Sequence, residues 1–194
     1  MIGRRELFHY TYAVLHHPAY RAKYEVNLKR EFPRLPFYED FRQWAKRGAA
    51  LMALHLGYEQ AAPFALKRED RKEPHSAQSD LLPDERVKPR RLLDEKPKLK
   101  PKLKADKAQG VIEVDAVTTL SGIPREAWDY KLGNRSALEW VLDQWKEHKI
   151  SDPTVAEKFD TYRFADYKEQ VIALLARVCT VSVETMKIVR AMPA

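Results

Sequence analysis

The chain has 194 residues, 44% of them hydrophobic and 32% charged, which suits a single domain with a core of its own. Its 35 Lys and Arg outnumber its 28 Asp and Glu, so the formal net charge of +7 favours polyanionic partners such as nucleic acid. A single cysteine excludes an internal disulfide, and no apolar run is long enough to cross a bilayer. The N-terminus has no signal-peptide pattern, so we expect a cytoplasmic protein. Helix-like sequence begins directly at the N-terminus, which suggests that the chain is a piece of a longer protein.

The first part of the chain predicts three helices. Apolar residues at helical spacing indicate a helix over residues 5–16, and the His17-Pro18 pair then breaks it. Pro18 can open a second helix that extends to about residue 32. A third helix is expected from Tyr38 or Asp40 to about Leu56, before Gly57.

Residues 67–107 differ in kind from the rest of the chain. They hold 14 Lys and Arg against 9 Asp and Glu, a difference of +5, together with five of the twelve prolines. Such a charged stretch, interrupted by prolines, is typical of a loop, an insertion or an arm. We therefore expect one domain over residues 1–194 with a basic, Pro-rich insertion at 67–107.

A small antiparallel sheet is expected to follow, built from about residues 98–132. Lysines alternate with apolar residues over 98–105, a period of two that predicts a strand with its lysines on one face and with Pro101 at an edge or a bulge. The β-branched run 111–117 predicts the returning strand. A third strand is expected over 127–132, followed by a turn at Gly133-Asn134.

The C-terminal part predicts helices again. Ser136 and Glu139 have the spacing of a capping box, so a helix should begin there and run to about His148. Another helix is expected over 167–178, and residues 181–192 form either a last helix or its continuation, with a break near Thr180. The predicted fold is α+β, with helices at both ends around the antiparallel sheet.

No group of residues is arranged for bond-making chemistry. Asp143, Glu147 and Lys149 follow the order found in some nucleases, but all three lie on or just past one helix, which favours a solvated face. The six histidines lack metal-ligand spacing, and no Gly-rich phosphate loop is present. We therefore predict no catalytic residue, metal ligand or cofactor in this chain.

Basic residues are the remaining functional signal. Two groups are candidates for DNA contact. The phosphate-binding candidates are Lys88, Arg90, Arg91, Lys98, Lys100, Lys102 and Lys104. The candidates for reading base edges are Lys131, Asn134 and Arg135. Two structural alternatives stay open: the lysines could guard an exposed strand edge, paired with Glu113 and Asp115, and Arg135 could pack locally.

Three long segments resemble the C-terminal specificity domain of Type ISP restriction–modification enzymes and related helicase–methyltransferase fusions. They read LFHYTYAVLHHPAYRAKYEVNLKREFPRLPF, GIPREAWDYKLGNRSALEWVLDQW and VCTVSVETMKIVRAMP. The chain departs from the family at three places. The family's usual turn is richer in glycine than the one at Asn134, and the basic segment 67–107 has little counterpart in the family. Residues 150–166 also differ from the family's usual sequence.

The resemblance implies a parent enzyme with nuclease, ATP-driven translocase, adenine-N6 methyltransferase and target-recognition parts. That parent would use S-adenosylmethionine, ATP and Mg²⁺, none of them held by this chain, and would act on double-stranded DNA. The first helices, Tyr10 to Tyr24, would pack on the methyltransferase or form a scaffold, while the turn at 131–135 would approach DNA. An alternative is a coupling domain that joins the methyltransferase and translocase parts without touching bases, and an independent enzyme is a third reading.

Overall fold

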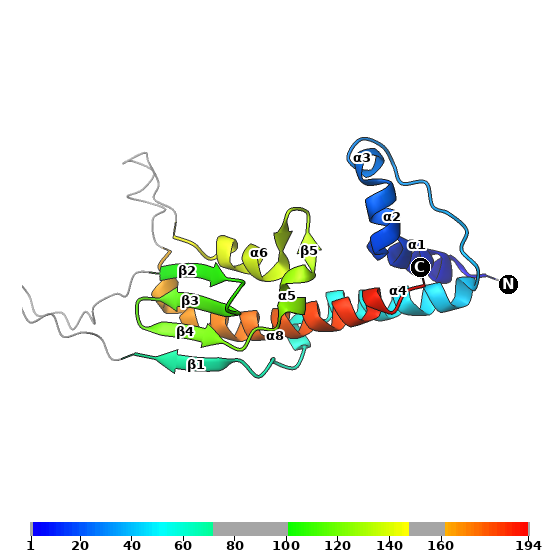
Figure 1. Cartoon of the computed structure of the whole chain (residues 1–194). Helices are drawn as coiled ribbons and strands as arrows, with labels where there is room; N and C mark the ends of the chain where they lie inside the picture. The colour runs from blue at the N-terminus through cyan, green and yellow to red at the C-terminus, as the bar shows by residue number, and fades with distance from the viewer. Residues whose placement is uncertain (1, 72–100, 148–161, 194) are drawn as a thin grey trace, which may run out of the picture.

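The computed structural model describes residues 2–71, 101–147 and 162–193. It is an elongated α+β molecule in which a helical half and a sheet half lie along one long C-terminal helix (Figure 1). The helices are α1 (Arg4–His16), α2 (Pro18–Lys23), α3 (Glu25–Leu28), α4 (Phe41–Leu56), the 3-10 turn η1 (Tyr58–Gln60), α5 (Arg125–Asp129), α6 (Ala137–Gln144) and α8 (Phe164–Arg190). The strands are β1 (Lys67–Asp70), β2 (Pro101–Asp106), β3 (Val111–Asp115), β4 (Thr118–Ser121), β5 (Lys131–Leu132) and β6 (Arg135–Ser136).

The helical half is built on the pair α1 and α4. Gly48 of α4 lies so close to α1 that a Cβ there would come within 1.8 Å of the His9 carbonyl oxygen. Aromatic side chains fill the core beside this contact, and Trp44 stacks on Tyr38 with ring centroids 4.5 Å apart. The Tyr10 hydroxyl donates to the Pro36 carbonyl oxygen at 2.7 Å and so holds the extended segment before α4.

The sheet half contains a four-stranded antiparallel sheet in the order β1-β4-β3-β2. Its buried face packs with α5, α6 and α8 around a core that includes Ile112, Leu120, Leu138 and Leu175. Strand β2 lies at an edge, and its register with β3 shifts between Pro101 and Lys104. The edge position and the irregularity predicted from Pro101 are therefore both confirmed.

The sheet differs from the prediction in its membership. Of the strand predicted over 127–132, residues 127–129 belong to helix α5, which buries Ala127 and Trp128. Only Lys131–Leu132 form a strand, β5, and it pairs with β6 outside the four-stranded sheet. The third strand of the core is instead β4, directly after β3. The predicted insertion also contributes to the sheet, since β1 and β2 are its two ends, while residues 72–100 lie outside the described residues.

The helices confirm most predicted starts and correct several ends. Asp40 caps α4 by accepting from the Gln43 N–H, and the capping box at Ser136 is present. The helix that begins at Pro18 ends at Lys23, with only the short α3 after it, and α6 ends at Gln144 and not near His148.

No break occurs near Thr180, because α8 is continuous and belongs to both cores. Leu175 and Cys179 pack in the sheet half, whereas Val189 and Met192, just past its end, pack in the helical half. Tertiary packing on both sides therefore outweighs the weak helix propensity of the β-branched residues.

A polar network joins the two halves where α4 meets α8. His55 contacts the Tyr12 hydroxyl through Nδ1 at 2.7 Å and the Thr185 hydroxyl through Nε2 at 2.9 Å. The Tyr130 ring stacks on the imidazole with centroids 5.3 Å apart. Burial, together with the nearby His16, lowers the pKa of His55 to about 4, so this imidazole is neutral at pH 7.

Candidate nucleic-acid interface

A two-stranded hairpin projects beside α6 and carries the three residues predicted to read base edges. Strands β5 and β6 pair Lys131 with Ser136 and Leu132 with Arg135 around an exposed turn. Gly133 adopts a φ of +70°, which glycine tolerates without strain. The Trp140 indole N–H donates to the Leu132 carbonyl oxygen at 2.7 Å, so α6 holds the hairpin in place.

Arg135 is held on the surface of α6. Its Nη1 donates to Asp143 Oδ2 at 2.6 Å, and its guanidinium carbon lies 5.6 Å from the Trp140 ring centroid. Asp143 also accepts from Lys146 Nζ at 3.1 Å. The local packing considered for Arg135 is therefore present, yet its side chain stays 44% exposed and has other N–H groups free to donate.

The other two predicted base-reading residues have fewer partners. Lys131 and Asn134 are exposed, and neither side chain forms an ion pair or hydrogen bond within the described parts of the chain. The hairpin thus brings Lys131, Asn134 and Arg135 together, but no observation tests their contact with bases. Their role stays a prediction.

Of the predicted phosphate ribbon, only Lys102 and Lys104 lie in the described residues. Both are exposed on β2 while Leu103 between them is buried, so the expected alternation is present there. Lys102 lies 3.7 Å from Glu113, one of the pairings considered for an edge strand. Asp115 is different, because it is buried and pairs with Lys168 at 2.7 Å. The remaining five, Lys88, Arg90, Arg91, Lys98 and Lys100, lie outside the described residues.

A basic hollow that the sequence reasoning missed lies next to the hairpin. It has a volume of about 600 Å³ and is lined by the β2–β3 turn, by both ends of α5 with Ile123 before it, and by the first residue of β5. Its lining side chains include Lys107, Gln109, Arg125, Trp128 and Lys131. These residues are scattered along the chain with no shared spacing, so only the folded structure could reveal that they meet.

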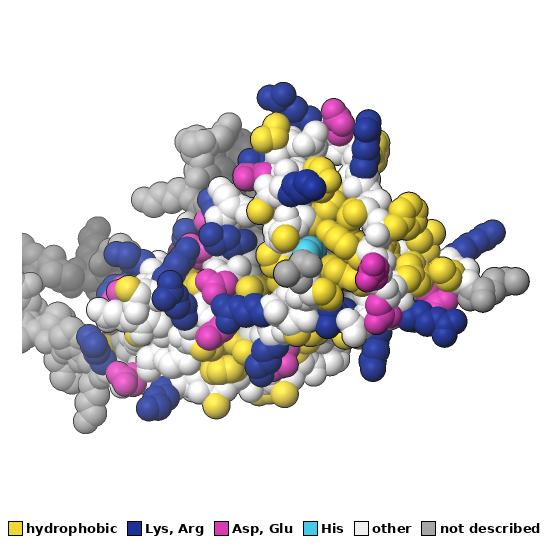
Figure 2. Space-filling view, turned by 45° about the vertical axis from the view of Figure 1, so that its right-hand side comes forward, with side chains coloured by type: hydrophobic (Ala, Val, Ile, Leu, Met, Phe, Trp, Pro, Cys, Tyr) yellow, Lys and Arg dark blue, Asp and Glu magenta, His cyan; other side chains and the backbone are white. Residues whose placement is uncertain are grey.

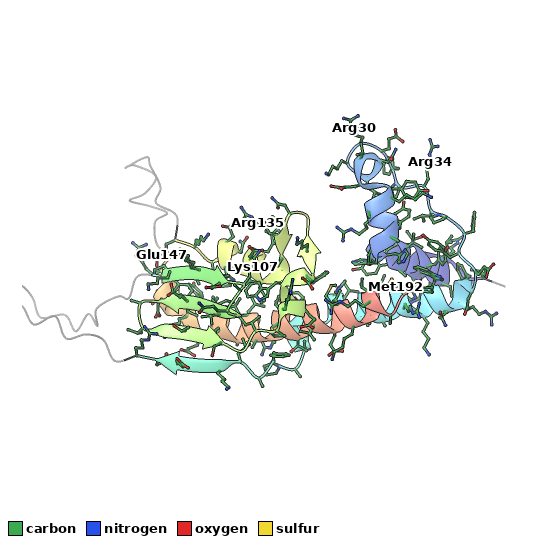
Figure 3. The ribbon with its side chains drawn as sticks, viewed as in Figure 1. Arg30, Arg34, Lys107, Arg135, Glu147 and Met192 are labelled. Carbon is green, nitrogen blue, oxygen red and sulfur yellow. The ribbon has the colours of Figure 1, made fainter. Side chains whose placement is uncertain are left out.

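An ion pair connects the hollow with α6. Lys107 Nζ lies 2.8 Å from Glu139 Oε1, and the Ser136 N–H and hydroxyl both donate to Glu139 Oε2 at 2.8 Å. Partial burial opposes the charge of this carboxylate, but Lys107 and Ser136 outweigh it and lower the pKa of Glu139 to about 2. Lys107 is therefore paired with a charged carboxylate at pH values near neutrality. Figure 3 labels Lys107 and Arg135 on this side of the molecule.

The two carboxylates of the trio with a nuclease-like order make structural contacts. Asp143 pairs with Arg135, Glu147 accepts the Phe164 N–H at 2.8 Å, and Lys149 lies outside the described residues. Within residues 2–71, 101–147 and 162–193, no cluster of three or more His, Cys, Asp or Glu could hold a metal ion. Nor does any helix in those ranges have the length and apolarity needed to cross a membrane.

Comparison with known proteins identifies the family. The family described as the Type ISP C-terminal specificity domain matches residues 1–174. The chain is a Type ISP C-terminal specificity domain. No curated protein matches it.

Solved structures share the fold of this specificity domain over its whole length. A cryo-EM structure of a DrdV–DNA complex matches with a TM-score of 0.84 and 52% identity over 100% of this chain. A nuclease-deletion mutant of the Type ISP restriction–modification enzyme LlaGI, in complex with a DNA substrate mimic, matches with a TM-score of 0.69 and 25% identity, also over the whole chain. The ATP-dependent Type ISP enzyme LlaBIII bound to DNA, at 22% identity and a TM-score of 0.67 over 100% of this chain, shows the fold alone. The specificity domain spans 18%, 16% and 11% of those three chains, respectively.

Proposed function

We propose that this specificity domain recognises a nucleotide sequence in duplex DNA on behalf of enzymatic parts to which it is joined. The observation that carries the proposal is the 52% identity, over its whole length, to part of a protein solved as a complex with DNA. The net charge of +7 is consistent with this partner. Recognition by the domain itself requires no bond-making residue.

Two groups of side chains would contact the DNA in different ways. Exposed lysines such as Lys102 and Lys104 would neutralise phosphates, which positions the duplex without reading it. The hairpin would present Arg135 toward guanine and Asn134 toward adenine, the pairings that fit the edges of these bases. Because Asp143 and Trp140 already order the Arg135 side chain, less conformational entropy would be lost when it meets a base.

The parent enzyme is part of the same proposal. It would combine nuclease, ATP-dependent translocase and adenine-N6 methyltransferase activities in the cytoplasm, with S-adenosylmethionine, ATP and Mg²⁺ held outside this chain. Within that assembly the specificity domain would choose the site at which the methyltransferase acts.

Selection from a randomised duplex pool tests this function. Wild-type protein should enrich one sequence motif, and the ratio of its affinity for that motif to its affinity for a scrambled duplex measures discrimination. Arg135→Ala should lower the ratio by about 5-fold to 150-fold, the 1–3 kcal/mol that a good base contact contributes. Arg30→Ala, which removes the same charge from the far helical half, should leave the ratio unchanged. Enrichment of no motif would contradict the proposal.

A second function, coupling to neighbouring parts of the parent chain, is favoured by the helical half. Hydrophobic side chains gather on the surface of this half (Figure 2). The large exposed ones in α1 to α4 and the segments before and between them are Ile2, Leu7, Phe8, Val26, Phe32, Phe37 and Leu56, with Phe32 96% and Phe37 97% exposed. Tyr10, Tyr20 and Trp44 of the same half are buried and do not contribute to this surface. Apolar exposure of this kind is typical of a surface that another domain covers.

Recognition and coupling can be separated by experiment. In the parent enzyme, Phe32→Ser with Phe37→Ser should increase protease cleavage between the specificity domain and the rest of the chain, while duplex discrimination by the isolated domain stays the same. Unchanged cleavage of the parent would show that this surface does not hold a neighbouring part.

A further inference from the structure

The basic hollow beside the hairpin collects cations from three separate segments. Lys107 comes from the turn between β2 and β3, Arg125 from the start of α5, and Lys131 from β5. All three side chains are exposed to solvent. Neither Arg125 nor Lys131 has an ion-pair partner among the residues that the structure describes, so their charges are available to a ligand.

The one carboxylate that lines the hollow is already occupied. Asp129 accepts from Arg190 Nη2 at 2.7 Å, and Glu126 lies 3.7 Å from Arg190 Nη1. Arg190 belongs to α8 and does not line the hollow. The cations of the hollow therefore have no carboxylate of their own except Glu139, which holds Lys107.

Trp128 supplies an independent sign of a missing acceptor. Its side chain lines the hollow and the residue is only 4% exposed, yet its indole N–H has no hydrogen-bond partner among the described residues. A buried N–H without an acceptor costs about 1–3 kcal/mol, so such groups in native proteins call for an explanation. The indole therefore lies beside the hollow with its N–H unpaired, and its resonance can report on what the hollow binds.

The hollow is also held in shape. The Ile123 N–H donates to the Gly110 carbonyl oxygen at 3.1 Å and ties the β2–β3 turn to the segment before α5. Gly110 has a φ of +65°, and a Cβ on it would meet the Ile123 carbonyl oxygen at 2.4 Å. Only glycine allows this approach, so the cations from the turn and from α5 are set at a defined separation before any ligand arrives.

We infer that this hollow binds a phosphate group of the DNA backbone, next to the bases that the hairpin reads. The inference rests on the proposed function and assigns Lys107, Arg125 and Lys131 to phosphate contact, beside the buried Trp128 indole. A phosphate offers several oxygens to donors arriving from different directions, and arginine matches it bidentately. Lys131 belongs to both the hollow and the hairpin, which places the phosphate contact and the base-reading turn on one continuous surface.

The salt dependence of duplex binding tests the inference. The slope of log K against log salt is about −0.9 per phosphate neutralised. Arg125→Ala should make the slope less steep by about 0.9 and weaken the selected and scrambled duplexes by the same factor, because a phosphate contact carries no sequence information. Arg30→Ala is again the matched control and should leave the slope unchanged.

A second readout follows the Trp128 N–H directly. In ¹⁵N-labelled protein its indole resonance, assigned with Trp128→Phe, should shift when duplex is added and much less in Arg125→Ala. Titration with inorganic phosphate and with a poly-glutamate peptide separates the sources of the anion. If duplex shifts the Trp128 resonance at concentrations at which inorganic phosphate and poly-glutamate do not, the bound group is a DNA phosphate.

The outcomes separate this inference from the proposed function. Sequence discrimination with an unchanged slope in Arg125→Ala would overturn the phosphate site and leave recognition intact. A reduced slope without any sequence discrimination would support the site and contradict recognition. A Trp128 shift produced by poly-glutamate but not by duplex would identify an acidic protein partner and overturn the inference, and no duplex binding at all would overturn both.

Discussion

Glu139→Gln should strengthen the binding of DNA by this specificity domain, although it removes a native ion pair. Glu139 holds Lys107 at 2.8 Å and so competes with any phosphate for the same ammonium group. Glutamine keeps the capping box, since its side chain can also accept at this position of the helix. The substitution therefore frees Lys107 while it leaves the start of α6 intact.

The size of the effect follows from the pKa of Glu139. A fall from 4.5 to about 2 corresponds to about 3 kcal/mol in favour of the charged form, shared among Lys107, the Ser136 hydroxyl and the Ser136 N–H. The Lys107 share is about 1 kcal/mol, because 48% of that side chain is exposed to solvent, which screens the pair. We expect a loss of about 1 kcal/mol in the free energy of unfolding at pH 7, and a gain of about fivefold in duplex affinity at low salt.

Equilibrium urea unfolding and duplex titration across a salt series measure the two effects. Lys107 would then strengthen the contact with the phosphate that Arg125 and Lys131 also hold, so the gain in affinity should be largest at low salt and should shrink as salt rises. Glu25→Gln, which breaks the exposed pair with Lys29 in the helical half, adds the same net charge and serves as the control. The stability difference between Glu139→Gln and wild type should also shrink as pH falls from 4.5 toward 2, because the carboxylate of the unfolded chain binds a proton before that of the fold does. An identical gain in affinity for both variants would refute the reasoning, since it would reflect overall charge alone.

Three further outcomes follow from the structure. Gly110→Ala should lower the free energy of unfolding by about 2–4 kcal/mol, because its new Cβ would meet Ile123. Gly133→Ala has a similar φ but open space around it, so it should lower the free energy of unfolding by only about 1 kcal/mol. Equal losses in urea unfolding would exclude the close contact as the cause. His55 stays neutral in the fold, so stability should fall by about 1–2 kcal/mol between pH 6.5 and 4 as the unfolded state binds the proton, and His55→Gln should remove this loss in melts at stepped pH. Phe37→Ser should leave the midpoint of thermal unfolding unchanged, because that side chain is 97% exposed; a lower midpoint would show that it packs within the domain.

Local signals in the sequence predicted the elements whose formation depends on near neighbours. The Ser136 and Glu139 capping box begins α6, and Asp40 caps α4. The alternation around Leu103 and the position of Pro101 identified an edge strand with an irregular register. Each of these features depends on residues within a few positions of one another, which a sequence displays directly.

Local propensity misled where packing between distant segments decided the outcome. The β-branched residues near Thr180 suggested a break, but two cores on either side keep α8 continuous. The aromatic run after Ile123 suggested a strand, but burial of Ala127 and Trp128 against α8 and α6 favours the helix α5. Propensity is a weak prior that tertiary contacts override.

The candidate site, too, could be predicted from the sequence only where its residues are neighbours in the chain. The sequences of three long segments pointed to the family and to the turn that carries Asn134 and Arg135, because residues adjacent in sequence remain adjacent in a two-residue turn; the pairing of β5 with β6 was not predicted. The pairing of β1 with β4, the ion pair of Lys107 with Glu139, and the meeting of Arg125 with Lys131 at one hollow depended on the folded chain. The physical reason is that these contacts join residues far apart in the chain, and their formation is set by the burial of the shared core, which no local pattern encodes.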